Sequence, residues 1–172
     1  MVEVMKKVSE RYEENVKAVR KVFPGALVLD VTLGGAMMKM DPGYPIGGVE
    51  IPGKFRKGLS VNGVWEGLKV FEKKDGIDER WMVDERKVGK VRGCKSWGKL
   101  MGIRVREEVI GEEDGKELMR ELYEGLMKER FGRVLEGIRK EAEKRVVVLL
   151  DYKDESDRPF NHVEVLKELI VA

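Results

Sequence analysis

Two aspartates at the ends of apolar runs are the first residues whose placement could support chemistry. Asp30 lies near the end of residues 26–32, "ALVLDVT", and Asp151 lies near the end of residues 145–152, "RVVVLLDY". If these runs form parallel neighbouring strands, both carboxylates open onto the edge where α/β sheets bind ligands. Two close carboxylates could then serve as a general acid and a general base. Capping of the turns that follow the strands is the alternative, and the sequence leaves both roles open.

A glycine pair follows the first of these runs. Gly34-Gly35 would let backbone N–H groups come close to a phosphate, and Lys39 supplies a cation nearby. The surrounding sequence matches neither G-x-G-x-x-G nor G-K-[ST], so it is not a dinucleotide or P-loop signature. A tight turn is the alternative for the glycines. Asp41 is a further candidate acid, although "DPG" is equally a turn sequence.

Residues 33–58 form a long connection that is rich in glycine and proline. Long connections in compact domains are usually functional or disordered, and the Met, Tyr, Ile and Phe residues here favour order. We therefore predict an ordered loop that packs over the carboxyl end of residues 26–32 and forms one wall of a pocket. A single exposed apolar patch would instead indicate a partner surface. Its members would be Met37, Met38, Met40 and Tyr44.

The segment 84–106 combines basic residues with an aromatic residue. It holds eight Lys and Arg residues against two acids, with Trp97 among them. This composition suits phosphate groups and a stacked base, so residues 86–106 are a candidate RNA-binding segment. The acidic stretch 107–121 offers the alternative that both segments are solvated faces that pair with one another.

Metal chemistry is not expected. His162 is the only histidine and Cys94 the only cysteine, so neither an imidazole nor a thiolate zinc site can be assembled. We predict no metal and no cofactor. His162 stands near the start of an apolar periodic run, where it could face a phosphate or another ligand. A capping or surface position is the alternative.

Composition limits the class of protein. Of the 172 residues, 42% are hydrophobic and 38% are charged, and glutamine is absent. High Lys, Glu and Arg content with few amides is typical of hyperthermophiles, which suggests a thermophilic source. The net charge of +2 does not demand a nucleic-acid partner. One cysteine, no signal peptide and no apolar run of about 18 residues predict a cytoplasmic protein without a membrane span.

The hydrophobic periodicity predicts one small domain, residues 1–172, of the α/β or α+β class. Its helices pack around a short sheet that contains residues 26–32 and 145–152, and the second strand is central because it is apolar throughout. Ser60 is the expected N-cap of a helix. The predicted helices span residues 2–22, 60–73, 114–144 (with a break at Gly132) and 162–171. Residues 75–110 are interrupted by glycines, and their pattern is ambiguous but allows short strands.

The segment "SVNGVWEGLKVF", with "DVTLGGAMMKMDPGYP" before it and "LLDYKDESDRPFNH" after it, resembles a family of uncharacterised archaeal and bacterial proteins. More remotely, the chain is similar to NADAR domains, which carry V-E-H-x-x-Q-A-x-K on one helix and an M-R-x-x-L-x-x-K-F-like pattern on another. Val61, Gly67 and Lys69 take the places of Val, Ala and Lys in the first motif. Residues 118–131 resemble the second.

NADAR proteins are N-glycosidases, which cleave ribosyl–nitrogen bonds in riboflavin-pathway intermediates or remove ADP-ribose from guanine. The resemblance implies an active-site acid where this chain has Asn62, with Gly63 in place of the histidine. Glu66 lies one helical turn beyond Asn62 and could replace that acid. The resemblance thus implies a metal-independent N-glycosidase for an N-ribosyl nucleotide or an ADP-ribose-type substrate.

The chemistry of C–N cleavage adds its own requirements. The reaction passes through an oxocarbenium-like state that needs a nearby carboxylate, for which Glu66 and Asp30 are suitable. Lys69 could help the glycine pair to hold a phosphate. A base could stack on Trp65 or Trp97, although core packing is the alternative for Trp65. Two other functions stay open: a non-enzymatic nucleotide- or RNA-binding module, and a structural or interaction protein.

Overall fold

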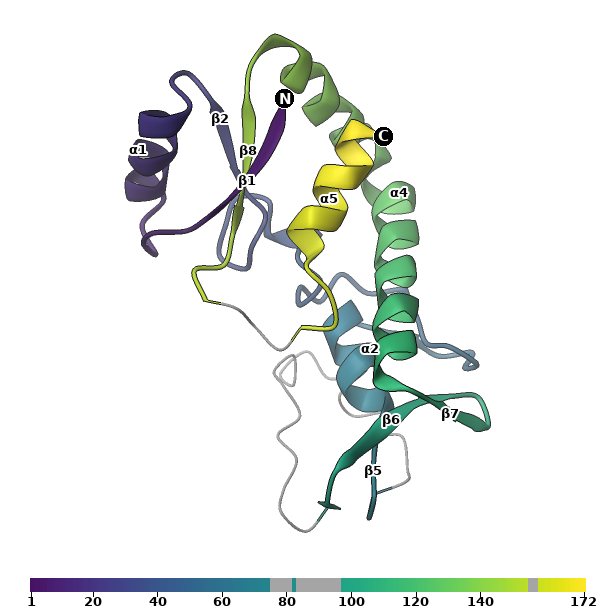
Figure 1. Ribbon diagram of the computed structural model, residues 1–172. Coiled ribbons are helices and arrows are strands. Elements are labelled where there is room, and N and C mark those ends of the chain that lie inside the picture. The colour runs from purple at the N-terminus through teal and green to yellow at the C-terminus, as the bar shows by residue number, and fades with distance from the viewer. Residues whose placement is uncertain (75–81, 83–96, 155–157) are drawn as a thin grey trace. The chain divides into compact units, whose positions relative to one another are not determined.

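The computed structural model describes residues 1–74, 82, 97–154 and 158–172 (Figure 1). The fold is α+β, with helices packed around short sheets, as the sequence predicts. The described residues group into two compact units, so the single-domain organisation remains a prediction. Residues 1–41, 124–154 and 161–172 are called here the parallel-sheet unit, and the other described residues are called the antiparallel-sheet unit.

A three-stranded parallel sheet is the centre of the parallel-sheet unit. Strand β8 (Val147–Asp151) lies between β1 (Val2–Lys6) and β2 (Leu27–Asp30) and pairs with both in parallel. The predicted strands 26–32 and 145–152 are therefore neighbours in one sheet. The central position of the second strand is confirmed.

Strand β8 is buried because both faces of the sheet are covered. Val148 and Leu150 belong to the apolar cluster that α1 (Tyr12–Val22) helps to form on one face. Val147 and Leu149 point to the other face and are also fully buried. Figure 1 shows α5 (His162–Val171), drawn in yellow, on that face.

The prediction of one helix over residues 2–22 is wrong for its first part. Residues 2–6 form β1, and α1 begins only at Tyr12. Val2 and Val4 are β-branched residues at alternate positions, and β1 pairs with β8 along its whole length. This long-range pairing outweighs the weak helical periodicity of so short a segment.

Helix α2 (Val61–Leu68) organises the antiparallel-sheet unit. Ser60 is its N-cap, as predicted, because the Ser60 side chain accepts a hydrogen bond from the Gly63 amide at 3.0 Å. The helix predicted over residues 60–73 ends early, because Lys69 adopts an extended conformation and begins a strand. The strands of this unit are β3 (Val49–Glu50) paired with β4 (Lys57–Gly58), and β5 (Lys69–Phe71), β6 (Leu100–Val105) and β7 (Glu108–Ile110) in a second antiparallel sheet.

Helix α4 (Glu112–Lys144) contributes residues to both units. The predicted break is present, because Phe131, next to Gly132, has non-helical torsion angles (φ −123°, ψ 16°). Charged pairs line the surface of this helix. One such pair is Arg145 with Glu141, in which the hydrogen bonds from the guanidinium group lower the pKa of the Glu141 carboxyl group.

We expect Gly137→Ala to stabilise the protein. Gly137 is exposed within α4, and an added Cβ would meet no atom within 4 Å. Alanine at an exposed helical position should raise the free energy of unfolding by about 0.5–1 kcal/mol, measured by calorimetry. Gly35→Ala is the matched comparison and should lower the melting temperature, because its Cβ would collide with the Asp30 carboxyl group. A lower melting temperature for Gly137→Ala would contradict the expectation.

Candidate functional site

The carboxyl ends of the three parallel strands meet at one edge of the sheet. In the pairing register, Lys6 of β1 lies opposite Asp151 of β8, and Asp30 of β2 lies opposite Leu150. The two aspartates therefore lie at the same edge, which is the geometry that the sequence reasoning required of parallel neighbours. This edge is also where open α/β sheets generally bind ligands.

Asp30 is held in a buried ion pair with Lys7. Lys7 Nζ lies 2.7 Å from Asp30 Oδ2 and 2.6 Å from Thr32 Oγ1. The Thr32 hydroxyl in turn donates to Asp30 Oδ1 at 2.6 Å, and the Thr32 amide donates to the same oxygen at 3.1 Å. All three residues are at least nine-tenths buried. Asp30 thus fastens the start of the loop after β2 to the residue that follows β1.

Asp151 has different partners. Its Oδ1 accepts a hydrogen bond from the Tyr152 amide at 2.7 Å, and its Oδ2 accepts one from Asn161 Nδ2 at 3.1 Å. Asn161 is the N-cap of α5, and its own side-chain oxygen accepts from the first amides of that helix. These bonds match the capping alternative for Asp151. Each of the two aspartates is held by its own set of partners.

His162 is buried at the same edge of the sheet. Its Nε2 lies 3.2 Å from the Val31 carbonyl oxygen and 3.6 Å from Asp41 Oδ2. The Tyr152 hydroxyl donates to the same Asp41 oxygen at 2.7 Å and accepts from the Leu33 amide at 2.9 Å. His162 and Asp41 are both almost completely buried. The cluster pins the loop after β2 at residues 31, 33 and 41.

The glycine pair lies inside this pinned loop. Gly34 has a positive φ of 86°, which glycine adopts without strain. A Cβ on Gly35 would collide with the Asp30 carboxyl group, so glycine is needed there for close packing. The Gly35 amide donates to the Thr32 carbonyl at 3.0 Å, while Lys39 is exposed on the short helix η1 (Met38–Met40). Phosphate binding by the glycine pair and Lys39 remains a prediction.

Residues 33–58 are not one structureless loop. They contain η1, β3 and β4, and they contribute to both units. The first part does pack at the end of β2, because the Met37 amide donates to the Asp30 carbonyl at 3.0 Å. Met40 is buried while Met38 is partly exposed, so the methionines do not form one exposed apolar patch.

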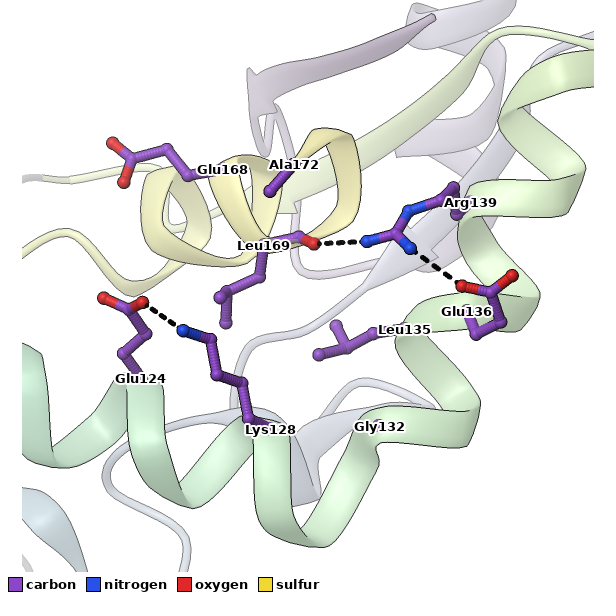
Figure 2. A pocket seen from close by; sticks show the side chains of 9 residues that line it. All are labelled: Glu124, Lys128, Gly132, Leu135, Glu136, Arg139, Glu168, Leu169 and Ala172. Carbon is purple, nitrogen blue, oxygen red and sulfur yellow. Dashed lines mark hydrogen bonds and ion pairs between the residues drawn. The ribbon is translucent and has the colours of Figure 1, made fainter.

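A groove of about 430 Å³ lies between α4 and the C-terminal end of α5 in the parallel-sheet unit (Figure 2). Arg139 forms part of its wall and donates to the Leu169 and Ile170 carbonyls at 3.1 and 2.8 Å. These bonds satisfy the last carbonyls of α5. None of the predicted site residues lines the groove, whose lining consists of Glu124, Lys128, Gly132, Leu135, Glu136, Arg139, Glu168, Leu169 and Ala172.

A second buried ion pair, in the antiparallel-sheet unit, joins Glu66 of helix α2 to Lys69, the first residue of β5. Lys69 Nζ lies 2.7 Å from Glu66 Oε2 and 5.6 Å from the centre of the Trp65 ring. Glu66, Lys69 and Trp65 are 6%, 8% and 2% exposed, so the carboxylate is almost completely removed from water. Burial of this kind requires a partner, and Lys69 supplies it.

Two polar atoms on the same helix lack a partner. Asn62 Oδ1 and Trp65 Nε1 are buried, and neither forms a hydrogen bond to the part of the chain that the structure describes. Buried polar atoms are nearly always satisfied, so such atoms call for an explanation. One explanation is a ligand that provides both a donor and an acceptor.

Trp97 is partly exposed but covered on one side. Its ring centre lies 5.4 Å from that of Phe71, and Lys74 Nζ lies 4.2 Å from the Trp97 ring centre. Residues 86–96 of the predicted RNA-binding segment lie outside the described residues. RNA binding through residues 86–106 remains a prediction.

Sequence reasoning did not identify three residues of these clusters, which are Lys7, Thr32 and Tyr152. The sequence predicts a helix at Lys7, and polar partners that are distant in the sequence leave no local signal.

The predicted site residues fall into two groups. The parallel-sheet unit holds Asp30, Gly34, Gly35, Lys39, Asp151 and His162, and the antiparallel-sheet unit holds Asn62, Trp65, Glu66, Lys69 and Trp97.

The fold and these two buried clusters define an α+β protein with a buried pair of a lysine and a carboxyl side chain in each of its units. The chain belongs to DUF6939, a family of unknown function, whose model matches residues 11–166. No curated protein and no solved structure matches it significantly. Among the described residues, no group of three or more His, Cys, Asp or Glu could hold a metal ion. None of the described helices is long and apolar enough to cross a membrane.

Lys7→Met should destabilise the protein strongly, because it leaves the Asp30 carboxylate buried without its cation. We expect the free energy of unfolding to fall by about 3–5 kcal/mol, measured by urea denaturation. Lys57→Met is the matched control, since Lys57 and Glu50 form an ion pair whose side chains are 53% and 78% exposed. It should cost less than about 1 kcal/mol. Equal losses in the two variants would contradict a special role for the buried pair.

Tyr152→Phe should loosen the loop after β2, because the Leu33 amide and Asp41 both lose the hydroxyl group that joins them. We expect faster hydrogen exchange at the Leu33 amide and a loss of about 1–3 kcal/mol in stability. Tyr12→Phe removes a hydroxyl that donates to the Val28 carbonyl and serves as the control. Unchanged protection of the Leu33 amide in Tyr152→Phe would show that the hydroxyl does not hold the loop.

Proposed function

We propose that the protein is a metal-independent N-glycosidase that hydrolyses an N-ribosyl nucleotide or an ADP-ribose-type substrate, with Glu66 as its catalytic carboxylate. The observation that carries the proposal is the burial of Glu66 beside Trp65, with Lys69 Nζ at 2.7 Å. A carboxylate that is shielded from water strongly stabilises a positive charge that develops beside it. Such a charge develops on the ribose when its C–N bond breaks.

The resemblance to NADAR domains also favours helix α2 as the position of the catalytic acid. Asn62 stands where those domains carry their acid, and Glu66 lies one turn further along α2. Lys69 stands at the position of their lysine. In this chain the ammonium group of Lys69 binds the Glu66 carboxylate, so its role in the proposal is to orient that carboxylate.

The unpartnered atoms of α2 suit a sugar substrate. A ribose hydroxyl both donates and accepts hydrogen bonds, so the hydroxyls of one ribose could serve Asn62 Oδ1 as donor and Trp65 Nε1 as acceptor. Binding would then supply the bonds that the described residues do not, and it would fix the sugar next to Glu66.

The proposed reaction is a hydrolysis. The bond between the anomeric carbon and the base nitrogen breaks, and its electron pair leaves with the nitrogen. The carboxylate of Glu66 stabilises the oxocarbenium-like sugar. An O–H bond of water breaks: the hydroxyl oxygen bonds to the anomeric carbon, and the proton goes to the departing base. The products are the free base and a sugar with a hydroxyl group on its anomeric carbon.

Glu66→Gln is the test of this proposal. The protein is incubated with ADP-ribosylated guanosine and with ribosylaminopyrimidine phosphates, and the released base or ribose is measured. Glutamine keeps the size of the side chain and removes its charge, so we expect turnover to fall roughly 10²- to 10⁴-fold. Glu117→Gln, on a side chain that is 60% exposed on α4, is the matched control and should keep full turnover.

Folding must be checked separately, because Lys69 loses its buried counter-ion in Glu66→Gln. Circular dichroism and the melting temperature of both variants establish that each remains folded at the assay temperature. Equal turnover by Glu66→Gln and the wild type would remove Glu66 from the mechanism. Failure of the wild type to cleave any of these ribosyl substrates would reject the proposed activity.

A further inference from the structure

The hairpin formed by β3 and β4 carries a fully exposed aromatic residue. Glu50 and Lys57 face each other at its base, and the connecting residues include Phe55, whose side chain is completely exposed. Ile51, at the start of the connection, is buried, so the hairpin is anchored by its base while residues 53–57 are exposed. A large aromatic ring left in water gains free energy when a binding partner covers it.

Several cationic residues lie next to Phe55 in the sequence. Lys54, Arg56 and Lys57 are its neighbours in sequence, and all three are exposed. Arg106 joins them from the turn between β6 and β7, since a Cβ on Gly53 would lie only 2.5 Å from Arg106 Cγ. Residues 52–57 contain no acid. The nearest exposed acid of the hairpin is Glu50 in β3, whose carboxylate lies 3.2 Å from Lys57 Nζ.

We propose that this hairpin, residues 52–57 with Arg106 beside it, binds a single-stranded polynucleotide. A base would stack on the flat face of Phe55, and the lysine and arginine side chains would neutralise the flanking phosphates. The surface belongs to the antiparallel-sheet unit alone. It lies outside the predicted segment 86–106 except for Arg106, and it does not depend on the activity proposed for Glu66.

The composition of the hairpin favours a polynucleotide over a membrane or a protein. Phe55 is the only exposed large apolar residue among residues 52–57, and a single aromatic ring gives too little buried area for stable membrane binding. The cores of protein interfaces are poor in lysine, whereas Phe55 stands directly between Lys54 and Arg56. An aromatic ring that can stack, with cations on both sides of it, is the combination that single-stranded nucleic-acid binding uses.

The test measures fluorescence anisotropy of a labelled oligouridine about ten nucleotides long, at several salt concentrations, with the full-length protein. We expect Phe55→Ala to weaken binding about 5- to 150-fold, and Phe55→Trp to retain it, because tryptophan also stacks. Lys54→Ala should reduce the slope of log affinity against log salt by about 0.7, the value for one lost phosphate contact. A DNA strand of matched sequence should bind through the same residues.

Two control variants lie in the same unit. Met101→Ala removes another exposed apolar side chain, and Lys116→Ala removes a cation from α4. Both should bind like the wild type. Because Phe55 is fully exposed, its variants should keep the wild-type melting temperature.

Three results would overturn the proposal. The first is the absence of oligonucleotide binding at low salt. The second is equal binding by Phe55→Ala and the wild type, which would place any polynucleotide site elsewhere. The third is Phe55-dependent binding to phosphatidylserine-containing vesicles without binding to oligonucleotides. Glu66→Gln should bind oligouridine like the wild type, so the hydrolysis assay and this assay can fail independently.

Discussion

The burial of β8 on both faces is the constraint on which the parallel-sheet unit depends. A strand inside an apolar core cannot leave its backbone amides and carbonyls without partners. β1 and β2 satisfy them from either side, and their parallel direction requires crossover connections instead of tight turns. All three strands therefore end at one edge, where the polar residues that follow them must be accommodated together. The ion pair of Lys7 with Asp30 and the cluster around Asp41 are the result.

Local signals in the sequence were sufficient for the elements that depend on local physics. Ser60 accepts the expected capping bond, α5 spans the periodic run from residue 162, and Gly132 adjoins the bend in α4. The boundary between β1 and α1 was not predictable in this way. Residues 2–6 are extended because β8 pairs with them, and that strand lies at the other end of the chain.

The same distinction applies to the candidate sites. Glu66 and Lys69 are three residues apart, so helical spacing alone suggests that they are neighbours. The pairing of Lys7 with Asp30 joins the end of β1 to β2. The Tyr152 hydroxyl bonds to the Leu33 amide, which is 119 residues away in the sequence. An atom such as Trp65 Nε1, which forms no hydrogen bond to the described residues, has no signature in the sequence, because its state depends on which residues the fold brings near it.

The central strand also determines the order in which the chain can assemble during synthesis. Val147 pairs with both Val2 and Leu27, so the two outer strands leave the ribosome long before the strand that joins them. Until then β1 and β2 have no partner in this sheet, and α1 can cover only part of their apolar surface. Parallel pairing over such sequence distances is slow and leaves strand edges open to incorrect association. The parallel sheet can therefore be completed only after residues 147–151 have been synthesised.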